Sequence, residues 1–186
     1  KSCEKIKYMF PKAHAAAYVT NAFRIAWFKV HIPLAYYAAY YSIRAKAFDA
    51  SCMIFGKEKV KNKMKEIEMK NQKKEATKAE LDMYDDLEIV LEMYERGFEF
   101  LPVDLYESEA TKFKIQENKL RPPLNSIPGF GGVAAQGIVE ARKDGKFMSI
   151  DDLKIRAKIG SSGADLLKEF GCLEGMSQSN QLSLFG

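Results

Sequence analysis

The sequence lacks several features that mark large classes of proteins. No stretch reaches the ~18 uncharged apolar residues of a membrane span, because the aromatic run at residues 30–43 is interrupted by His31 and Pro33. There is no signal peptide and no initiating Met, so we expect a fragment of a longer cytoplasmic protein without membrane contacts. The three cysteines have no metal-binding spacing and cannot all pair within the chain, which indicates free thiols in a reducing compartment.

The modest net charge of +4 conceals blocks of opposite sign. Residues 57–79 hold nine Lys and four Glu, whereas residues 80–109 hold eleven Asp or Glu and one Arg. A basic block is a candidate phosphate-facing surface. The acidic block is either a solvated helix face or a surface that keeps polyanions away, and both interpretations stay open.

Helical patterns cover most of the chain, so the expected fold class is mainly α. Residues 110–115 alternate in polarity and predict a strand that turns at residues 116–118 and pairs with 119–121. Residues 71–79 are polar and Lys-rich and predict a loop or a frayed helix end. Helices are expected at residues 11–30, 33–41, 57–68 and 87–96, and again, with glycine-bearing turns between them, from residue 122 onward.

The string from Ile127 to Ala135 predicts a tight turn between two helices. Its glycines, Gly129, Gly131 and Gly132, allow positive φ and a close approach of another backbone. The N–H groups of Gly131, Gly132 and Val133 would lie at a helix N-terminus, which binds phosphate, while Phe130 would point into the core. The pattern is typical of a helix-hairpin-helix motif, which binds the sugar-phosphate backbone without reading sequence. A turn without a ligand is the alternative.

A second, poorer copy of this pattern follows. Ser149 to Asp152 reads as a capping box that opens a helix, and residues 158–163 would form the second hairpin. Taken singly, each candidate contact here could equally be an ordinary surface residue. The candidate phosphate contacts added by this region are Lys143, Lys146, Lys158, Gly160 and Ser161.

A third pattern surrounds the start of the first helix and forms a candidate nucleotide-binding set. Lys12 and His14 place positive charge at a helix N-terminus, against the dipole, which an anionic ligand would explain. Tyr18 shares a face with His14 at i, i+4 spacing, and Tyr8 and Phe10 could stack on a base. The alternative is that the aromatic side chains belong to the core and Lys12 faces solvent.

The last residues read Gln181-Leu182-Ser183-Leu184-Phe185, after a polar stretch at 177–180 that predicts flexibility. Exposing apolar side chains to water at a chain end is unfavourable, so Leu182, Leu184 and Phe185 predict a peptide that fills a pocket on another protein. The alternative is a tail that folds back onto its own domain.

These sequence segments, in their order along the chain, resemble the PolC-type alpha subunit of bacterial DNA polymerase III. Residues 5–19 are similar to the fingers domain of that family, residues 122–129 to a later stretch, and Gln181 to Phe185 to the pentapeptide that binds the sliding clamp. The resemblance implies the C-terminal part of such a polymerase. Its expected segments are the end of the helical fingers domain (1–56), a helical connector (57–109), a β hairpin with a tandem helix-hairpin-helix module (110–175) and a flexible clamp-binding tail (176–186).

The resemblance implies that the parent is a DNA-directed DNA polymerase of the bacterial cytoplasm. The implied partners are primer-template duplex DNA, a deoxynucleoside triphosphate and the beta sliding clamp. It also implies that the catalytic aspartates, and the Mg²⁺ they bind, belong to a palm domain upstream of Lys1. A non-enzymatic helix-hairpin-helix adaptor of repair or recombination that binds the clamp is the alternative, but it has no use for the nucleotide-binding set.

The carboxylates of this chain do not predict a catalytic centre. Asp85-Asp86 and Asp151-Asp152 are neighbours on expected helices, where adjacent side chains point about 100° apart. We therefore expect no metal site, no cofactor and no catalytic residue in this chain, and no polymerase activity from it alone.

Overall fold

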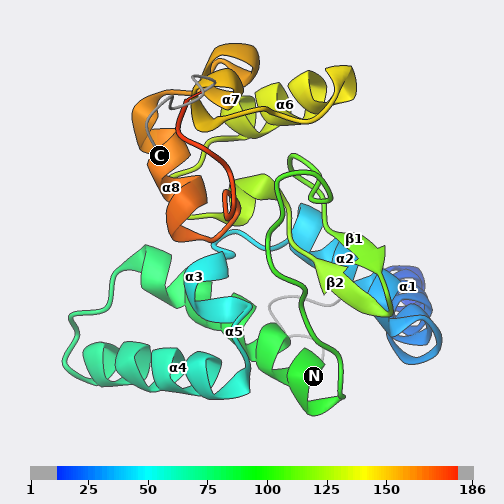
Figure 1. Ribbon diagram of the computed structural model, residues 1–186. Coiled ribbons are helices and arrows are strands. Elements are labelled where there is room, and N and C mark those ends of the chain that lie inside the picture. Colours follow the sequence, from blue (N-terminus) through cyan, green and yellow to red (C-terminus); the bar gives the residue numbers. More distant parts are fainter. Residues whose placement is uncertain (1–11, 180–186) are drawn as a thin grey trace, which may run out of the picture.

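The computed structural model describes residues 12–179, and most of this part is helical (Figure 1). The mainly α fold class predicted from the sequence is confirmed. The first half holds α1 (Lys12–His31), α2 (Pro33–Ile43), α3 (Ala50–Met53), α4 (Lys57–Gln72) and α5 (Lys78–Glu95). The second half holds β1 (Lys114–Gln116), β2 (Lys119–Arg121), the 3₁₀ turn η2 (Leu124–Ser126), α6 (Gly132–Ala141), η3 (Arg142–Asp144), α7 (Ile150–Ala157) and α8 (Ser161–Glu169).

Helices α4 and α5 lie against each other and are joined by a shorter loop than the sequence predicts. α4 continues to Gln72, and α5 begins at Lys78 rather than near Leu87. The early start follows from Thr77, whose hydroxyl accepts from the Glu80 N–H while the Glu80 carboxylate accepts from the Thr77 N–H. This capping box satisfies donors that a helix start otherwise leaves open.

The β hairpin is shorter than predicted. Ile115 pairs with Leu120, and the turn residues Glu117 and Asn118 both have positive φ, as a two-residue type I′ turn requires. The predicted strand at 110–115 is wrong for its first four residues. The reason is that the carbonyl of Ala110 accepts a hydrogen bond from the N–H of Asn125, so this stretch joins η2 instead of the sheet.

Two hydrophobic clusters form the interior, and the partly buried Ile54 contacts both. The connector core lies among α2–α5 and the β hairpin, and the module core lies among η2 and α6–α8, in the upper part of Figure 1. Fully buried members of the connector core are Tyr37, Met53, Ile67, Leu87, Met93 and Leu120; those of the module core are Leu105, Leu124, Ile127, Ile138, Leu153 and Leu167.

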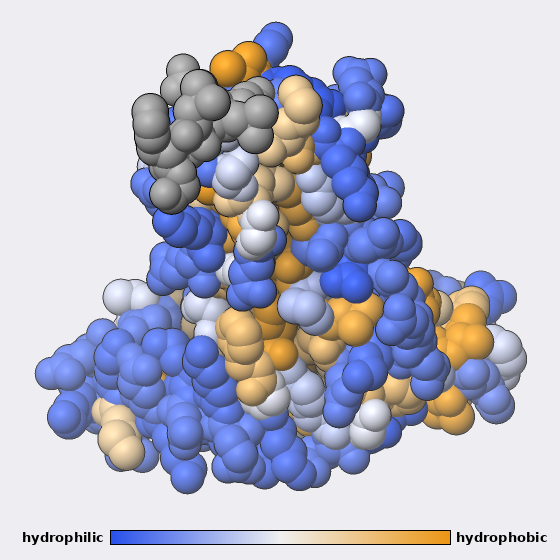
Figure 2. Space-filling view, viewed as in Figure 1, coloured by the Kyte–Doolittle hydropathy of each residue, from blue (hydrophilic) through white to orange (hydrophobic). Residues whose placement is uncertain are grey.

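Helix α1 differs from all the others of similar length because it has no buried residue, although it is rich in apolar side chains. Phe23 is 73% exposed and Trp27 is 54% exposed. Figure 2 shows the resulting hydrophobic surface on the side of α1 and α2, in contrast to the hydrophilic surface over α4. Nowhere in residues 12–179 is a helix both long enough and apolar enough to cross a bilayer.

Candidate nucleic-acid interface

The first hairpin has the geometry of a tight turn that opens a helix. Gly129 has φ +79°, and the N–H of the buried Phe130 donates to the Ile127 carbonyl at 3.0 Å. Gly131 is the N-cap of α6, and the first intrahelical bond runs from the Ala135 N–H to its carbonyl. As at any helix start, the N–H groups of residues 132–134 have no acceptor within the helix. The prediction that Phe130 enters the core is confirmed.

The second hairpin repeats the same order of a positive-φ residue, a buried residue and an N-cap glycine. Lys158 takes the left-handed conformation (φ +55°), the buried Ile159 follows, and Gly160 is the N-cap of α8, which begins at Ser161. The Ala164 N–H donates to the Gly160 carbonyl, so the N–H groups of residues 161–163 are the open donors here. The left-handed Lys158 therefore stands where the first hairpin has a glycine.

The two hairpins contact each other. A β-carbon built on Gly163 would lie 3.4 Å from the Phe130 ring, and one built on Gly129 would lie 3.5 Å from Cδ1 of Leu166. Phe130 also lies in the same buried cluster as Ala164 and Leu167 of α8, so the starts of α6 and α8 share one core.

Charge separates these two helix starts from the third helix of the module. α6 and α8 have no acidic residue in their first turns, whereas α7 has Asp151 and Asp152. Carboxylates at a helix N-terminus occupy the position that an anion would take. The starts of α6 and α8 are therefore open to an anionic ligand, while α7 supplies its own negative charge.

The candidate lysines divide between two loops. Lys158 lies in the second hairpin, but Lys143 and Lys146 follow the far end of α6, whose ten residues span about 15 Å. Lys143 forms an ion pair with Glu140, and the Lys146 ammonium lies 5.8 Å from the centre of the Tyr106 ring. The structure therefore does not bring Lys143 and Lys146 to the N-terminal amides of α6.

Two arginines that the sequence reasoning missed hold the loop after α6. Arg142 donates to the carbonyls of Leu105 and Ser108, and Arg156 donates to the carbonyls of Ala141, Gly145 and Lys146. The Arg156 guanidinium also lies 4.7 Å from the centre of the Phe147 ring. No local sequence pattern identifies these partners, since all are backbone carbonyls brought together by the tertiary fold.

The candidate nucleotide-binding set is only partly within the described residues, because Tyr8 and Phe10 precede residue 12. Lys12, His14 and Tyr18 lie on the exposed first half of α1, which has no acidic residue in its first turn. The His14 and Tyr18 rings contact edge to face with centroids 4.5 Å apart, which confirms that the two share a helix face.

The last turn of α1 is held by a polar network on α2 and α5. The Lys29 ammonium pairs with Glu92, and Arg96 donates to the Lys29 carbonyl at 2.9 Å and to the Tyr37 hydroxyl at 3.1 Å. Tyr37 in turn donates to Glu92, and burial is the main cause that raises the pKa of Tyr37 to about 12. The tyrosine thus stays a neutral donor at physiological pH.

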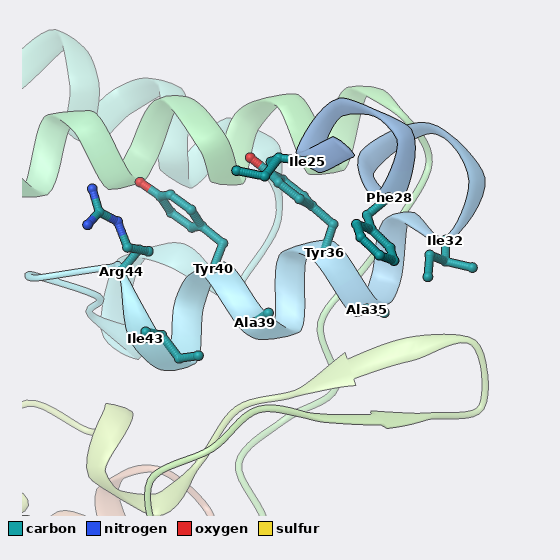
Figure 3. Close-up of a pocket in the computed structure, with 9 residues that line it drawn as sticks. All are labelled: Ile25, Phe28, Ile32, Ala35, Tyr36, Ala39, Tyr40, Ile43 and Arg44. Carbon is teal, nitrogen blue, oxygen red and sulfur yellow. The ribbon is translucent and has the colours of Figure 1, made fainter. Parts of the chain in front are cut away.

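Beside this network, α1 and α2 form an apolar groove of about 750 Å³ (Figure 3). Tyr36 and Tyr40 from α2 line it with Ile25 and Phe28 from α1, and Arg44 stands at its end. Apart from Arg44, the lining consists of apolar and aromatic side chains.

One aspartate of each adjacent acidic pair has a structural role. Asp86 is 3% exposed and accepts from the N–H groups of Lys46 and Ala47 and from the Tyr40 hydroxyl; burial raises its pKa. Asp152 accepts from the Met148 N–H and pairs with Arg156. Within residues 12–179, no three His, Cys, Asp or Glu side chains gather as metal ligands.

The predicted clamp-binding residues, Gln181 to Phe185, lie outside the described residues. The polar stretch before them begins with two residues that are bound to the module. The Ile150 N–H donates to the Ser177 carbonyl at 2.9 Å, and the Asp151 N–H donates to the Gln178 carbonyl at 3.1 Å.

Comparison with known proteins gives one family match and many close relatives. The family described as a helix-hairpin-helix motif matches residues 97–182. Proteins named DNA polymerase III PolC-type are 51% identical in Caldanaerobacter subterraneus subsp. tengcongensis, 51% in Clostridium perfringens and 52% in Streptococcus suis. Each alignment covers the whole of this chain, over 185 or 186 residues, and the chain spans 13% of the length of each relative.

Proposed function

Since the chain belongs to the PolC-type DNA polymerase III family and carries a helix-hairpin-helix module, we propose that it is the part of a replicative polymerase that holds the duplex. The observation that carries the proposal is the contact between two hairpins that open α6 and α8 without an acidic residue in either first turn. Each helix start offers backbone N–H donors and the positive end of a helix dipole to a phosphate. Contacts of this kind position a protein on DNA without reading bases.

The test measures binding of the chain to labelled duplexes of unrelated sequence, with fluorescence anisotropy as the readout, at several salt concentrations. Equal affinities are expected for all duplexes, because no base edge is contacted. The logarithm of the binding constant should fall linearly with the logarithm of salt concentration, since phosphate contacts release counterions. Binding that depends on sequence and ignores salt would refute the proposal.

For the start of α1 we propose contact with the incoming nucleotide. Lys12 and His14, with Tyr8 and Phe10 before them, would face the triphosphate and the nascent base pair, and Tyr18 would hold the His14 ring. The support is a helix start that combines Lys12 with no acidic residue in its first turn. The measurement is the KM for deoxynucleoside triphosphates of the full-length polymerase, which we expect Lys12→Ala to raise.

Polymerase activity we assign to the whole parent protein and not to this chain. Nucleotidyl transfer uses metal ions held by convergent carboxylates, and we propose that these carboxylates and their Mg²⁺ lie in the part of the relatives that this chain does not cover. We expect no primer extension by the purified chain. Extension products from a template-primer with Mg²⁺ would contradict this assignment.

For Gln181 to Phe185 we propose binding to the beta sliding clamp, with the apolar side chains in a pocket of the clamp. A Leu184→Ala/Phe185→Ala variant should lose that binding in calorimetric titration. The adaptor alternative receives no support from the comparisons, because the identity with PolC-type proteins extends over residues that a clamp-binding adaptor does not need.

A further inference from the structure

Helix α1 carries apolar side chains on two opposite faces. Ile25 and Phe28 face the groove that α1 forms with α2 (Figure 3). Phe23 and Trp27, four residues apart, share a second face. That face lies about 200° around the helix from Ile25, since each residue turns an α-helix by about 100°. All four side chains are between 48% and 73% exposed. A helix that is apolar on opposite sides is typical of a protein interior and not of a surface.

The apolar surface continues around the turn between α1 and α2. A second hollow, of about 320 Å³, shares Ile32 and Ala35 with the groove and extends to Phe98 and Ile115. The two hollows therefore form one continuous apolar surface that runs along α2 and reaches the β hairpin. Contiguous exposed apolar surface of this kind marks a site where other protein packs.

Exposed apolar side chains are concentrated in this part of the molecule. Nine of the sixteen exposed large hydrophobic side chains in residues 12–179 lie in residues 12–43, and the other seven are spread over residues 44–179. The connector core and the module core thus cover most of their own apolar side chains. What is left uncovered belongs to α1, α2 and the turn between them.

The comparisons indicate what covers this surface. The identity with PolC-type proteins extends over the whole chain, α1 and α2 included, yet the chain spans 13% of the length of those relatives. An apolar surface that stays covered by the same polypeptide resembles one half of a divided domain core. We infer that α1 is an interior helix of a domain that this chain shares with the rest of the parent polymerase. Segments of that polypeptide fill the groove and cover Phe23 and Trp27.

The chemistry of the surface favours protein over nucleic acid as its occupant. Interfaces with nucleic acid are polar and strongly positive. Arg44 is the one charged side chain among the residues that line the groove, and the nearby Lys29 is already paired with Glu92. A partner that binds and leaves needs one face of a helix, whereas α1 has two opposite faces to cover. Both observations fit permanent enclosure by the parent chain.

The inference has a consequence for the first half of α1. The polar contacts of α1 with α5 involve Lys29, in its last turn. Lys12 and His14 lie at the other end of the helix, whose twenty residues span about 30 Å. The shared domain would therefore also fix the part of α1 that carries these two residues. The inference rests on the proposed assignment of this chain to a longer polymerase, and it does not depend on duplex binding.

The test compares hydroxyl-radical footprints of this chain and of the full-length parent polymerase. Phe23 and Trp27 should be oxidised in this chain and should lose most of that reactivity in the polymerase, because the core of a protein interface excludes water. Met69, which is exposed on α4, should react equally in both. If Phe23 and Trp27 react as strongly in the polymerase as in this chain, the inference is overturned, while duplex binding, measured separately, can still stand.

A matched pair of variants checks the groove. Ile25→Glu places a charge in the groove, and Ile155→Glu makes the same change on α7, where the side chain is 76% exposed. In this chain, both variants should keep the helix content and the denaturation midpoint, because both side chains already face solvent. In the full-length polymerase, Ile25→Glu should restore oxidation of Trp27 and lower the melting temperature, and Ile155→Glu should do neither. Equal effects of the two variants in the polymerase would contradict the inference.

Two further results would assign the surface to a different occupant and overturn the inference. Protection of Trp27 that disappears when the polymerase is diluted would indicate a second copy of the protein. Protection that requires added duplex DNA would indicate nucleic acid. Enclosure within one polypeptide predicts the same protection at every protein concentration, with and without DNA.

Discussion

The backbone of Gly137 on α6 lies directly against the carbonyl oxygen of Ala157 at the end of α7. A β-carbon built on Gly137 would be 2.4 Å from that oxygen, and the oxygen belongs to the backbone and cannot rotate away. We therefore expect Gly137→Ala to push α6 from α7 and to lower the free energy of unfolding by about 1–3 kcal/mol, the range found for overpacked cores. Chemical denaturation measures the change.

Gly132→Ala is the matched control on the same helix. A β-carbon at Gly132 would meet only Cγ2 of Thr111 at 3.7 Å, which is an ordinary contact. Its unfolding free energy should stay within about 0.5 kcal/mol of the parent chain. Equal stability of the two variants would mean that the approach of α6 to α7 is looser than described.

The second prediction separates backbone donors from side chains in DNA binding. Gly132 and Ser161 are the first residues of α6 and α8, where proline is well tolerated, and the preceding Gly131 and Gly160 have extended backbones that accept a following proline. Gly132→Pro and Ser161→Pro each remove one N–H that would face a phosphate. Each should weaken duplex binding by about tenfold, since a hydrogen bond to a charged group contributes about 1.5–3 kcal/mol.

Alanine at the same positions provides the comparison. Gly132→Ala and Ser161→Ala keep the N–H groups, so duplex affinity should remain within about twofold of the parent chain. Circular dichroism must show the same helix content in all four variants. Equal affinity of the proline and alanine variants would rule out these two amides as phosphate ligands.

The sequence predicted those features of the site that depend on local chemistry. The first hairpin was recognisable from its glycines and Phe130, and the His14–Tyr18 contact from helical spacing. Thr77 and Glu80 also have the spacing of a capping box, but the lysine-rich composition around them favoured a loop over a helix start.

Features that depend on tertiary contacts could not be predicted from the sequence. Gly137 sits in an ordinary helical pattern, and only the packing of α7 shows why it has no side chain. The hydrogen bonds from Arg142 and Arg156 to backbone carbonyls, and those from the start of α7 to the carbonyls of residues 177 and 178, join segments far apart in the sequence. The separation of Lys143 and Lys146 from the α6 amides follows from the ten-residue length of that helix.

The third prediction concerns the attachment of α1. Arg96 donates to the Lys29 carbonyl and the Tyr37 hydroxyl, and its guanidinium lies 5.7 Å from the centre of the Tyr37 ring. Since α1 has no buried residue, these contacts act together with its packing against α2 and with the Lys29–Glu92 ion pair. Arg96→Ala should lower the free energy of local opening of α1 by about 1–2 kcal/mol. Hydrogen exchange should therefore accelerate in residues 24–31, while exchange in α6–α8 stays unchanged.

Arg96→Lys should not restore protection, because two different guanidinium nitrogens reach the Tyr37 hydroxyl and the Lys29 carbonyl, and a lysine has a single nitrogen to place. Arg24→Ala serves as the control, since it removes an exposed arginine from the same helix. If Arg24→Ala accelerates exchange as much as Arg96→Ala does, the attachment of α1 does not depend on Arg96.

The fourth prediction is a pH dependence at the junction of α4 and α5. Glu80 accepts from Lys70 and from the Thr77 N–H and hydroxyl, and the Lys70 hydrogen bond is the main cause that lowers its pKa from 4.5 to about 2. A carboxyl whose pKa is lowered by folding stabilises the fold above its unfolded pKa, and that contribution is lost as pH falls. The stability difference between the parent chain and Glu80→Gln should therefore be constant above pH 4.5 and shrink between pH 4.5 and about 2.

NMR titration of the Glu80 carboxyl provides the direct measurement, and Lys70→Ala should move its midpoint upward toward 4.5. A midpoint that Lys70→Ala leaves unchanged would show that the capping box alone, and not the link between the two helices, sets the charge of Glu80.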